Sequence, residues 1–210
     1  MCGIVGVASA GGDAERLAFA GVVSLQHRGH ESWGLASRRR DGVAVRRELG
    51  FARWSPAGGE DAPAAAAIGH VRYSTTGASR IENAQPFTVA GERRRVAIAH
   101  NGNVTNAPAL TAQLRAAGWT FRSTSDSEVI LALLATAPGD APDAVAAALE
   151  RLEGAVTVVA LVDGALLAFR DAHGFRPLVV GERDGMAAAA SETCALDALG
   201  AGRQEGPAPA

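Results

Sequence analysis

The amino-acid sequence predicts an α+β domain in which helices flank stacked antiparallel sheets. Short apolar or alternating runs typical of strands recur along the chain, and three of their connections carry Asp-Gly, the dipeptide that suits two-residue hairpin turns. Helical patterns are grouped between these hairpins. With 210 residues, of which 48% are hydrophobic, the chain can bury a full core, and we expect one domain.

The predicted strands follow from these runs in chain order. Because Asp-Gly supplies the positive φ angles of a type I′ turn, Asp41-Gly42, Asp163-Gly164 and Asp184-Gly185 each predict a hairpin between the flanking strands. Strands joined in this way are antiparallel. The segments with a strand pattern are residues 3–9, 33–39, 43–48, 65–71, 96–99, 155–162, 165–170, 177–181 and 186–190.

Helix start and stop signals frame the remaining segments. Asn106 is a predicted N-cap, and Ser125 with Glu128 has the spacing of a capping box. The predicted helices are residues 13–27, ended by Gly29, then 106–118, 125–135, and 142–152, closed by Gly154. We expect the domain to span residues 1–200 and the Gly-, Pro- and Ala-rich residues 201–210 to form a flexible tail.

Composition excludes several classes of function. The formal net charge of -2 provides no basic field for nucleic acid or an anionic membrane, and no apolar run of 18 residues predicts a membrane-spanning helix. Two distant cysteines, Cys2 and Cys194, form neither a disulfide framework nor a metal-ligand set. A cysteine at position 2 leaves no room for a signal peptide, so we expect a cytoplasmic protein that binds small molecules.

Cys2 is the first candidate for chemistry. A thiol ionises near neutral pH and attacks a carboxamide carbon, and a free α-amine titrates at a pH of roughly 7.7 to 8.0. If Met1 is removed, Cys2 carries nucleophile and base in one residue, and no histidine base is required. The alternative is that Cys2 is a small apolar residue that opens a strand.

Three polar segments of the chain provide candidate partners for this nucleophile. Arg72 suits a carboxylate, although a surface arginine on a Ser/Thr turn is as plausible. Asn101 and Gly102 could form a two-donor oxyanion hole, or belong to a turn before the Asn106 cap. Asp126 at a helix start could receive an ammonium group or only satisfy the helix dipole.

Taken in order, these segments closely resemble the class II glutamine amidotransferase domain, and within that family the amidophosphoribosyltransferase branch. Each match alone is weak, but together they span nearly the whole chain. The matching segments are MCGIVG at 1–6, QHRG at 26–29, GHVRYSTTG at 69–77, NAQPF at 83–87, HNGNVTN at 100–106, TSDSEVI at 124–130, RDAHGFRPL at 170–178 and SETCALD at 191–197.

The resemblance implies a four-layer αββα sandwich, the N-terminal-nucleophile (Ntn) hydrolase fold, and a role for each candidate. Cys2 would be the nucleophile and its own amine the base, while Asn101 and Gly102 would form the oxyanion hole. In the substrate-binding set, Arg72 would bind the glutamine α-carboxylate, Asp126 its α-ammonium, and Arg28 would order the terminus. The same set includes Thr75, Thr76 and His100, and the loop 73–77 would close over bound glutamine.

The resemblance also implies a reaction. The Cys2 thiolate would attack the glutamine side-chain amide, form a γ-glutamyl thioester with release of ammonia, and be regenerated by hydrolysis to glutamate. No metal or organic cofactor is needed. The expected partners are glutamine and an ammonia-accepting synthase or transferase subunit, with oligomer formation possible and no nucleic acid or membrane bound.

One hypothesis is favoured at this point, and three alternatives to it remain open. Because no phosphoribosyltransferase domain follows within the 210 residues, the favoured hypothesis is a glutaminase that supplies a separate synthase. The chain could instead be the glutaminase fragment of a two-domain amidophosphoribosyltransferase. It could be a catalytically silent glutamine-binding domain, or an amidohydrolase acting on another amide, although Arg72 and Asp126 suit the two charged ends of an amino acid.

Overall fold

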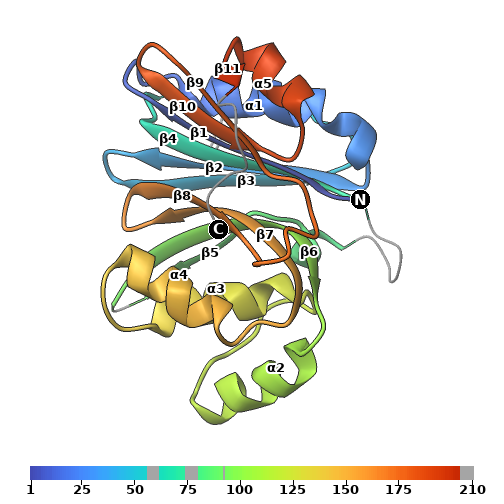
Figure 1. The fold of residues 1–210 in the computed structure, drawn as a ribbon, viewed down its shortest axis with the longest axis vertical. Helices are drawn as coiled ribbons and strands as arrows, with labels where there is room; N and C mark the ends of the chain where they lie inside the picture. The colour runs from blue at the N-terminus through green and yellow to red at the C-terminus, as the bar shows by residue number, and fades with distance from the viewer. Residues whose placement is uncertain (56–61, 74–79, 92, 204–210) are drawn as a thin grey trace.

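The protein is described by a computed structural model that covers residues 1–55, 62–73, 80–91 and 93–203. Within these residues the fold is the predicted αββα sandwich. Two antiparallel sheets lie face to face, one pair of helices covers the outer side of the first sheet, and three helices cover the outer side of the second (Figure 1). No helix among the described residues is long and apolar enough to cross a bilayer.

The first sheet has seven strands in the order β11-β9-β10-β1-β4-β2-β3. Its central strand is β1, which pairs with β10 on one side and β4 on the other. The strands are β1 (Gly3–Ser9), β2 (Ser32–Arg39), β3 (Gly42–Leu49), β4 (Ala66–Arg72), β9 (Val179–Arg183), β10 (Met186–Ala190) and β11 (Gly202–Arg203). Every ladder in this sheet is antiparallel, so the C-terminal ends of neighbouring strands lie alternately at opposite ends of the sheet.

The second sheet has four strands in the order β5-β6-β7-β8 and is also antiparallel. Its strands are β5 (Phe87–Ala90), β6 (Arg95–Val104), β7 (Gly154–Val162) and β8 (Ala165–Arg170). β6 is longer than predicted, because residues 100–104 continue its pairing with β7 instead of forming a loop. The oxyanion candidates therefore lie on a strand, which holds them more rigidly than a loop.

Helices α1 (Ala14–Ser24) and α5 (Thr193–Leu199) pack on the first sheet, and α2 (Ala107–Ala116), α3 (Ser127–Thr136) and α4 (Ala141–Leu149) lie on the side of the second (Figure 1). Short 3₁₀ helices, η1 (Gln26–Arg28) and η3 (Ile81–Asn83), lie in the connections. A separate apolar cluster fills each helix–sheet interface. A third cluster, between the two sheets, contains Ile4, Ala36, Ala66, Ile68, Ala97, Ala99, Val159, Leu161, Leu178 and Ala189.

The predicted hairpins are confirmed, because β2–β3, β7–β8 and β9–β10 are joined at the three Asp-Gly dipeptides. Only Asp163-Gly164 has both residues at positive φ, 49° and 89°. β5, β11 and α5 were not predicted. β5 and β11 are short, with four and two residues, and α5 has only seven, so each carries little periodic signal.

Two predicted helix caps are wrong in detail. Ser125 Oγ accepts from the Ser127 amide at 3.3 Å, whereas the Glu128 carboxylate accepts from the Arg122 and Ser123 amides upstream. Asn106 precedes α2 but makes no capping bond; its side chain joins the residues before β7, donating to Arg151 O at 2.8 Å. The side chains of Glu128 and Asn106 thus connect neighbouring segments instead of capping their own helices.

The predicted tail also begins too early. Ala201 is buried against the first sheet, and Gly202–Arg203 pairs with β9 as strand β11. Backbone pairing does not require apolar side chains, so a Gly- and Pro-rich composition does not exclude a short edge strand. Residues 204–210 lie outside the described part of the chain.

Candidate active site

The predicted site residues come from both sheets, and of these residues Arg72 and Asp126 lie within electrostatic range of Cys2. Cys2 immediately precedes β1, and because Gly3 pairs with Val71, Cys2 lies at the same edge as Arg72, the last residue of β4. Asn101 and Gly102 lie near the end of β6. Asp126 immediately precedes α3 and is joined to β6 by a hydrogen bond from the Val104 amide to Asp126 Oδ2, at 2.7 Å.

Cys2 is half-buried, and its thiol points toward the Tyr73 carbonyl oxygen, with Sγ 3.9 Å from it. Burial raises the pKa of this thiol above its ordinary value. The Tyr73 carbonyl contact, the chain amine and the Arg72 guanidinium oppose this shift, while Asp126 adds to it. Arg72 and Asp126 therefore both lie within electrostatic range of the sulfur, and the thiol needs a base to become a nucleophile.

Arg28 holds the main chain of Cys2. Its Nε donates to the Cys2 carbonyl oxygen at 2.8 Å, and its Nη1 is ion-paired with Glu192 Oε1. Only 7% of the Arg28 side chain is exposed. The guanidinium thus holds the main chain of the candidate nucleophile.

Arg72 lines a cavity of about 820 Å³ together with Asn103 and Asp126. One of its guanidinium nitrogens is ion-paired with Glu31, which leaves N–H groups able to bind a ligand carboxylate. Asp126 Oδ1 receives only a long contact, 3.5 Å, from Ser127 Oγ, so this oxygen can accept from a ligand ammonium. Charges of opposite sign therefore line one cavity, although Cys2 is not among its described lining residues.

Asn101 and Gly102 have the properties of close-approach donors. Asn101 is 2% exposed, and its Nδ2 has no hydrogen-bond partner among the described residues. A Cβ at Gly102 would lie 1.9 Å from Ala155 O and 2.6 Å from His100 Nε2, so only glycine fits there. A buried amide without a partner costs stability unless a ligand completes it.

The structure corrects the prediction that His100 binds substrate. Its ring is buried, with Nδ1 2.8 Å from Ser127 Oγ and Nε2 3.3 Å from Ala155 O. Both nitrogens are thus used by the protein, and the ring supports the strand beside Gly102. Thr75 and Thr76, with most of the expected closing loop, lie outside the described residues.

His70 and two carboxylates lie beside these residues and were not predicted from the sequence. His70 on β4 is fully buried next to His100, and burial, with smaller effects of His100 and Arg72, lowers its pKa to about 3. The two carboxylates are Glu31, which pairs with Arg72, and Glu192, which pairs with Arg28. Each carboxylate is far from its arginine along the chain, by 41 and 164 residues, so the sequence did not indicate these pairs.

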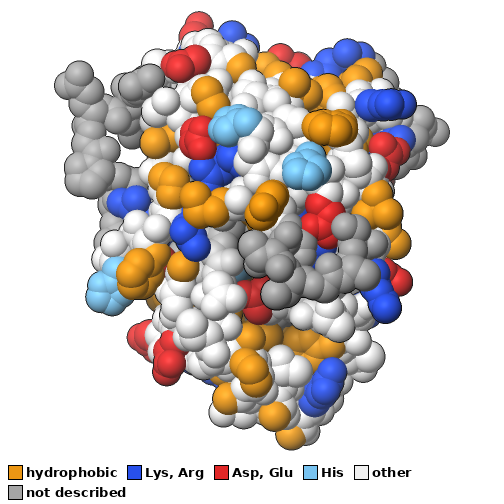
Figure 2. Space-filling view, turned by 90° about the vertical axis from the view of Figure 1, so that its right-hand side faces the viewer, with side chains coloured by type: hydrophobic (Ala, Val, Ile, Leu, Met, Phe, Trp, Pro, Cys, Tyr) orange, Lys and Arg blue, Asp and Glu red, His pale blue; other side chains and the backbone are white. Residues whose placement is uncertain are grey.

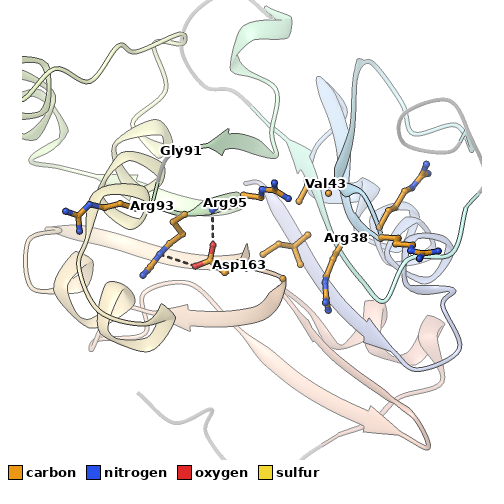
Figure 3. Close-up of a pocket in the computed structure, with 12 residues that line it drawn as sticks. Arg38, Val43, Gly91, Arg93, Arg95 and Asp163 are labelled. Atoms are coloured by element: carbon orange, nitrogen blue, oxygen red, sulfur yellow. Dashed lines mark hydrogen bonds and ion pairs between the residues drawn. The ribbon is translucent and has the colours of Figure 1, made fainter.

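A second cavity, of about 670 Å³, lies at the other end of the strands. Arg38 pairs with Ala66 at the start of β4, and with a rise of roughly 3.3 Å per residue this is about 20 Å from Arg72. Its arginine side chains diverge, while Asp163 binds the Arg95 amide and the Arg94 side chain (Figure 3). Because the charges do not converge on one point, this cavity is not the candidate site.

The face on which the N-terminus lies carries no single dominant charge. Acidic, basic, histidine and hydrophobic side chains are interspersed over it (Figure 2). Such a surface is compatible with a zwitterionic ligand and offers no continuous basic stripe for a polyanion.

Comparison with known proteins identifies the family of the chain. Residues 70–198 match the family described as glutamine amidotransferase domain. The chain is 43% identical over 209 residues to an amidophosphoribosyltransferase from Archaeoglobus fulgidus, covering 95% of this chain and 45% of that protein. It is 40% identical over 207 residues to the chloroplastic amidophosphoribosyltransferase 2 of Arabidopsis thaliana, covering 94% of this chain and 36% of the relative.

Solved structures give the same result. A structure described as the allosteric regulatory enzyme of purine biosynthesis superposes with a TM-score of 0.86 at 31% identity, over 97% of this chain and 44% of that one. The glutamine phosphoribosylpyrophosphate (PRPP) amidotransferase from B. subtilis, complexed with ADP and GMP, gives 0.82 at 31% identity, with the same coverage. The chain thus spans less than half the length of these relatives. Its fold, its matched residues and these relatives show that the chain belongs to the family of glutamine amidotransferase domains.

Proposed function

We propose that Cys2, freed by removal of Met1, hydrolyses glutamine to glutamate and ammonia. The observation that carries this proposal is the meeting of Cys2 with two opposite charges, Arg72 and Asp126, at one edge of the sandwich. Free glutamine carries a carboxylate and an ammonium on its α-carbon. Arg72 and Asp126 complement these two groups, and the side-chain amide is left for the thiol.

In the proposed mechanism the α-amine of Cys2 takes the thiol proton, and the sulfur attacks the amide carbon. The tetrahedral intermediate collapses when the carbon–nitrogen bond breaks, and the nitrogen leaves as ammonia with the proton from the amine. Water then attacks the γ-glutamyl thioester, with the amine again as base, and releases glutamate with the thiol restored. Each step needs only groups of Cys2, substrate and water.

Asn101 and Gly102 stabilise the oxyanion of both intermediates. The Asn101 Nδ2 that lacks a partner among the described residues is a ready donor, and glycine at position 102 lets Ala155 O and the His100 ring pack against the main chain that carries the second donor. Arg28 acts through the Cys2 carbonyl and orients the nucleophile without touching the reacting atoms. The segment 73–77 with Thr75 and Thr76 is proposed to close over bound glutamine, as such lids exclude water.

We propose that the ammonia passes to an acceptor unit, and the names of the relatives support a class for it. Those relatives are amidophosphoribosyltransferases, and the chain matches less than half of their length. We propose a phosphoribosyl-group transferase as the acceptor unit, either a separate subunit or part of the same polypeptide. Association with that unit, or with further copies of the chain, is part of the proposal.

Intact mass spectrometry with a glutamine-like diazoketone tests the nucleophile and the substrate together. The expected result is loss of Met1 and one covalent adduct that excess glutamine prevents. Cys2→Ala is the matched variant and must remain unmodified, while Cys194→Ala, which removes the other thiol, must still form the adduct. Retention of Met1, or an adduct that glutamine does not block even with the acceptor unit present, overturns the proposal and favours a silent glutamine-binding domain.

A further inference from the structure

Three side chains with metal-binding atoms meet beyond the end of strand β10, next to the start of α5. His27 belongs to η1, Glu192 precedes α5, and Cys194 lies in the first turn of α5. His27 Nε2 is 2.9 Å from Glu192 Oε2, and Cys194 Sγ is 3.6 Å from the same oxygen. The three ligand atoms all lie within 4.8 Å of one another.

Two of these separations, from Glu192 Oε2 to the histidine nitrogen and to the cysteine sulfur, can be compared with those of a tetrahedral zinc site. Zinc bonds of roughly 2.0–2.2 Å to nitrogen and oxygen and about 2.3 Å to sulfur place neighbouring ligand atoms about 3.4–3.6 Å apart. The sulfur–oxygen separation already has this value, and the nitrogen–oxygen separation is about half an ångström too short. A small rotation of the exposed His27 ring is enough to admit the ion.

The hydrogen bonds around the cluster are those of a metal-bound histidine. His27 Nδ1 is 3.1 Å from the Ser24 carbonyl oxygen, which can only accept, so Nδ1 carries a proton. Nε2 then faces the Glu192 carboxylate, another acceptor. Metal-bound histidines commonly donate their second N–H to a backbone carbonyl, which fixes the ring for coordination.

Cys194 also faces acceptors on two sides. Its Sγ lies 3.7 Å from the Ser24 carbonyl oxygen and 3.6 Å from Glu192 Oε2, although one thiol proton can serve only one of them. A divalent cation satisfies the sulfur, the carboxylate and the imidazole together, and the thiol proton is released to solvent. The cluster is open to solvent, because 56% of the His27 and 33% of the Glu192 side chain is exposed.

We propose that His27, Glu192 and Cys194 form a zinc-type site whose occupancy loosens the nucleophile. Glu192 uses Oε2 toward the cluster and Oε1 toward Arg28, which in turn holds the Cys2 carbonyl. A cation on Oε2 withdraws charge from the carboxylate and repels the guanidinium, so the Arg28–Glu192 contact weakens. The same repulsion limits affinity and makes the site reversible.

The binding half of this proposal is independent of activity, whereas the coupling half rests on the proposed glutaminase function. Zinc binding is measured by competition with a chromophoric chelator in the Cys2→Ala chain, so that the nucleophile cannot bind the ion. The expected result is one equivalent of zinc, with affinity at least tenfold lower when Cys194→Ala or His27→Ala is added. His30→Ala, a change of another histidine outside the cluster, must leave the affinity unchanged.

Cobalt replacing zinc supplies a second readout, a thiolate-to-cobalt absorption band that must vanish in Cys194→Ala. Absence of zinc binding in Cys2→Ala, or equal binding with and without Cys194, overturns the site. For the coupling, zinc must slow diazoketone labelling of Cys2 in the otherwise unchanged chain and not in Cys194→Ala. Equal slowing in both overturns the coupling, and labelling without zinc shows separately whether the nucleophile works.

Discussion

Replacing His70 with leucine is expected to remove a specific part of the acid sensitivity of the fold. His70 is fully buried on β4, and its pKa falls from 6.5 to about 3, mainly because burial disfavours the charged ring. Neither ring nitrogen makes a well-formed hydrogen bond to a described residue, although the His100 backbone lies close enough to act on the ring. An apolar residue is therefore tolerable there.

The sign and the size of the change in unfolding free energy follow from the linkage between proton binding and folding. Below pH 6.5 the unfolded chain binds a proton at this histidine that the folded chain does not, so its contribution is fully present above pH 6.5 and is lost as the pH falls toward 3. Between pH 7 and pH 5 the loss is about 2 kcal/mol in the free energy of unfolding.

Urea unfolding of wild type, His70→Leu and the exposed-site control His173→Gln at both pH values measures this difference. We expect wild type and control to lose about 2 kcal/mol more than His70→Leu between pH 7 and pH 5. Equal losses in His70→Leu and wild type would refute the assignment of a neutral, buried His70.

Three further predictions concern the site and one helix. Gly102→Ala places a Cβ 1.9 Å from Ala155 O and displaces an oxyanion donor, so glutaminase kcat should fall by about 10²–10³-fold; unchanged kcat would contradict the oxyanion assignment. Asp126→Asn can still accept from the Val104 amide but loses its charge, so KM for glutamine should rise at least about tenfold while the melting curve stays unchanged. Asp140→Ala breaks the reciprocal Asp140–Asp143 cap of α4 and should cost about 1 kcal/mol in urea unfolding, with normal glutaminase kinetics.

Much of the fold was predictable because its strands obey local rules. The ranges of β1, β8 and β10 coincide with alternating or continuous apolar runs, and the hairpins that contain β8 and β10 are marked by Asp-Gly. Residues 100–104 were predicted as a loop because polar side chains gather there, yet they form the end of β6. Backbone pairing overrides side-chain polarity where a strand end also provides a site.

The candidate site was predictable in its residues but not in its connections. The resemblance named Arg28 and Arg72, whereas their carboxylate partners are brought to them only by the fold. His100 illustrates the same limit, because a histidine in a polar motif can point toward a ligand or into the core. Only the contacts of its two nitrogens show that it supports the strand.

The cluster between the two sheets determines how the halves of the site are aligned. Cys2 and Arg72 belong to one sheet and Asn101 and Gly102 to the other, so the spacing of the layers sets the distance between nucleophile and oxyanion donors. That spacing rests largely on alanines such as Ala97. An alanine side chain has no alternative rotamer, so it cannot move aside when a neighbouring side chain becomes larger. These buried methyl groups therefore set the spacing of the candidate site, and we expect a single added methylene there to misalign it without touching it.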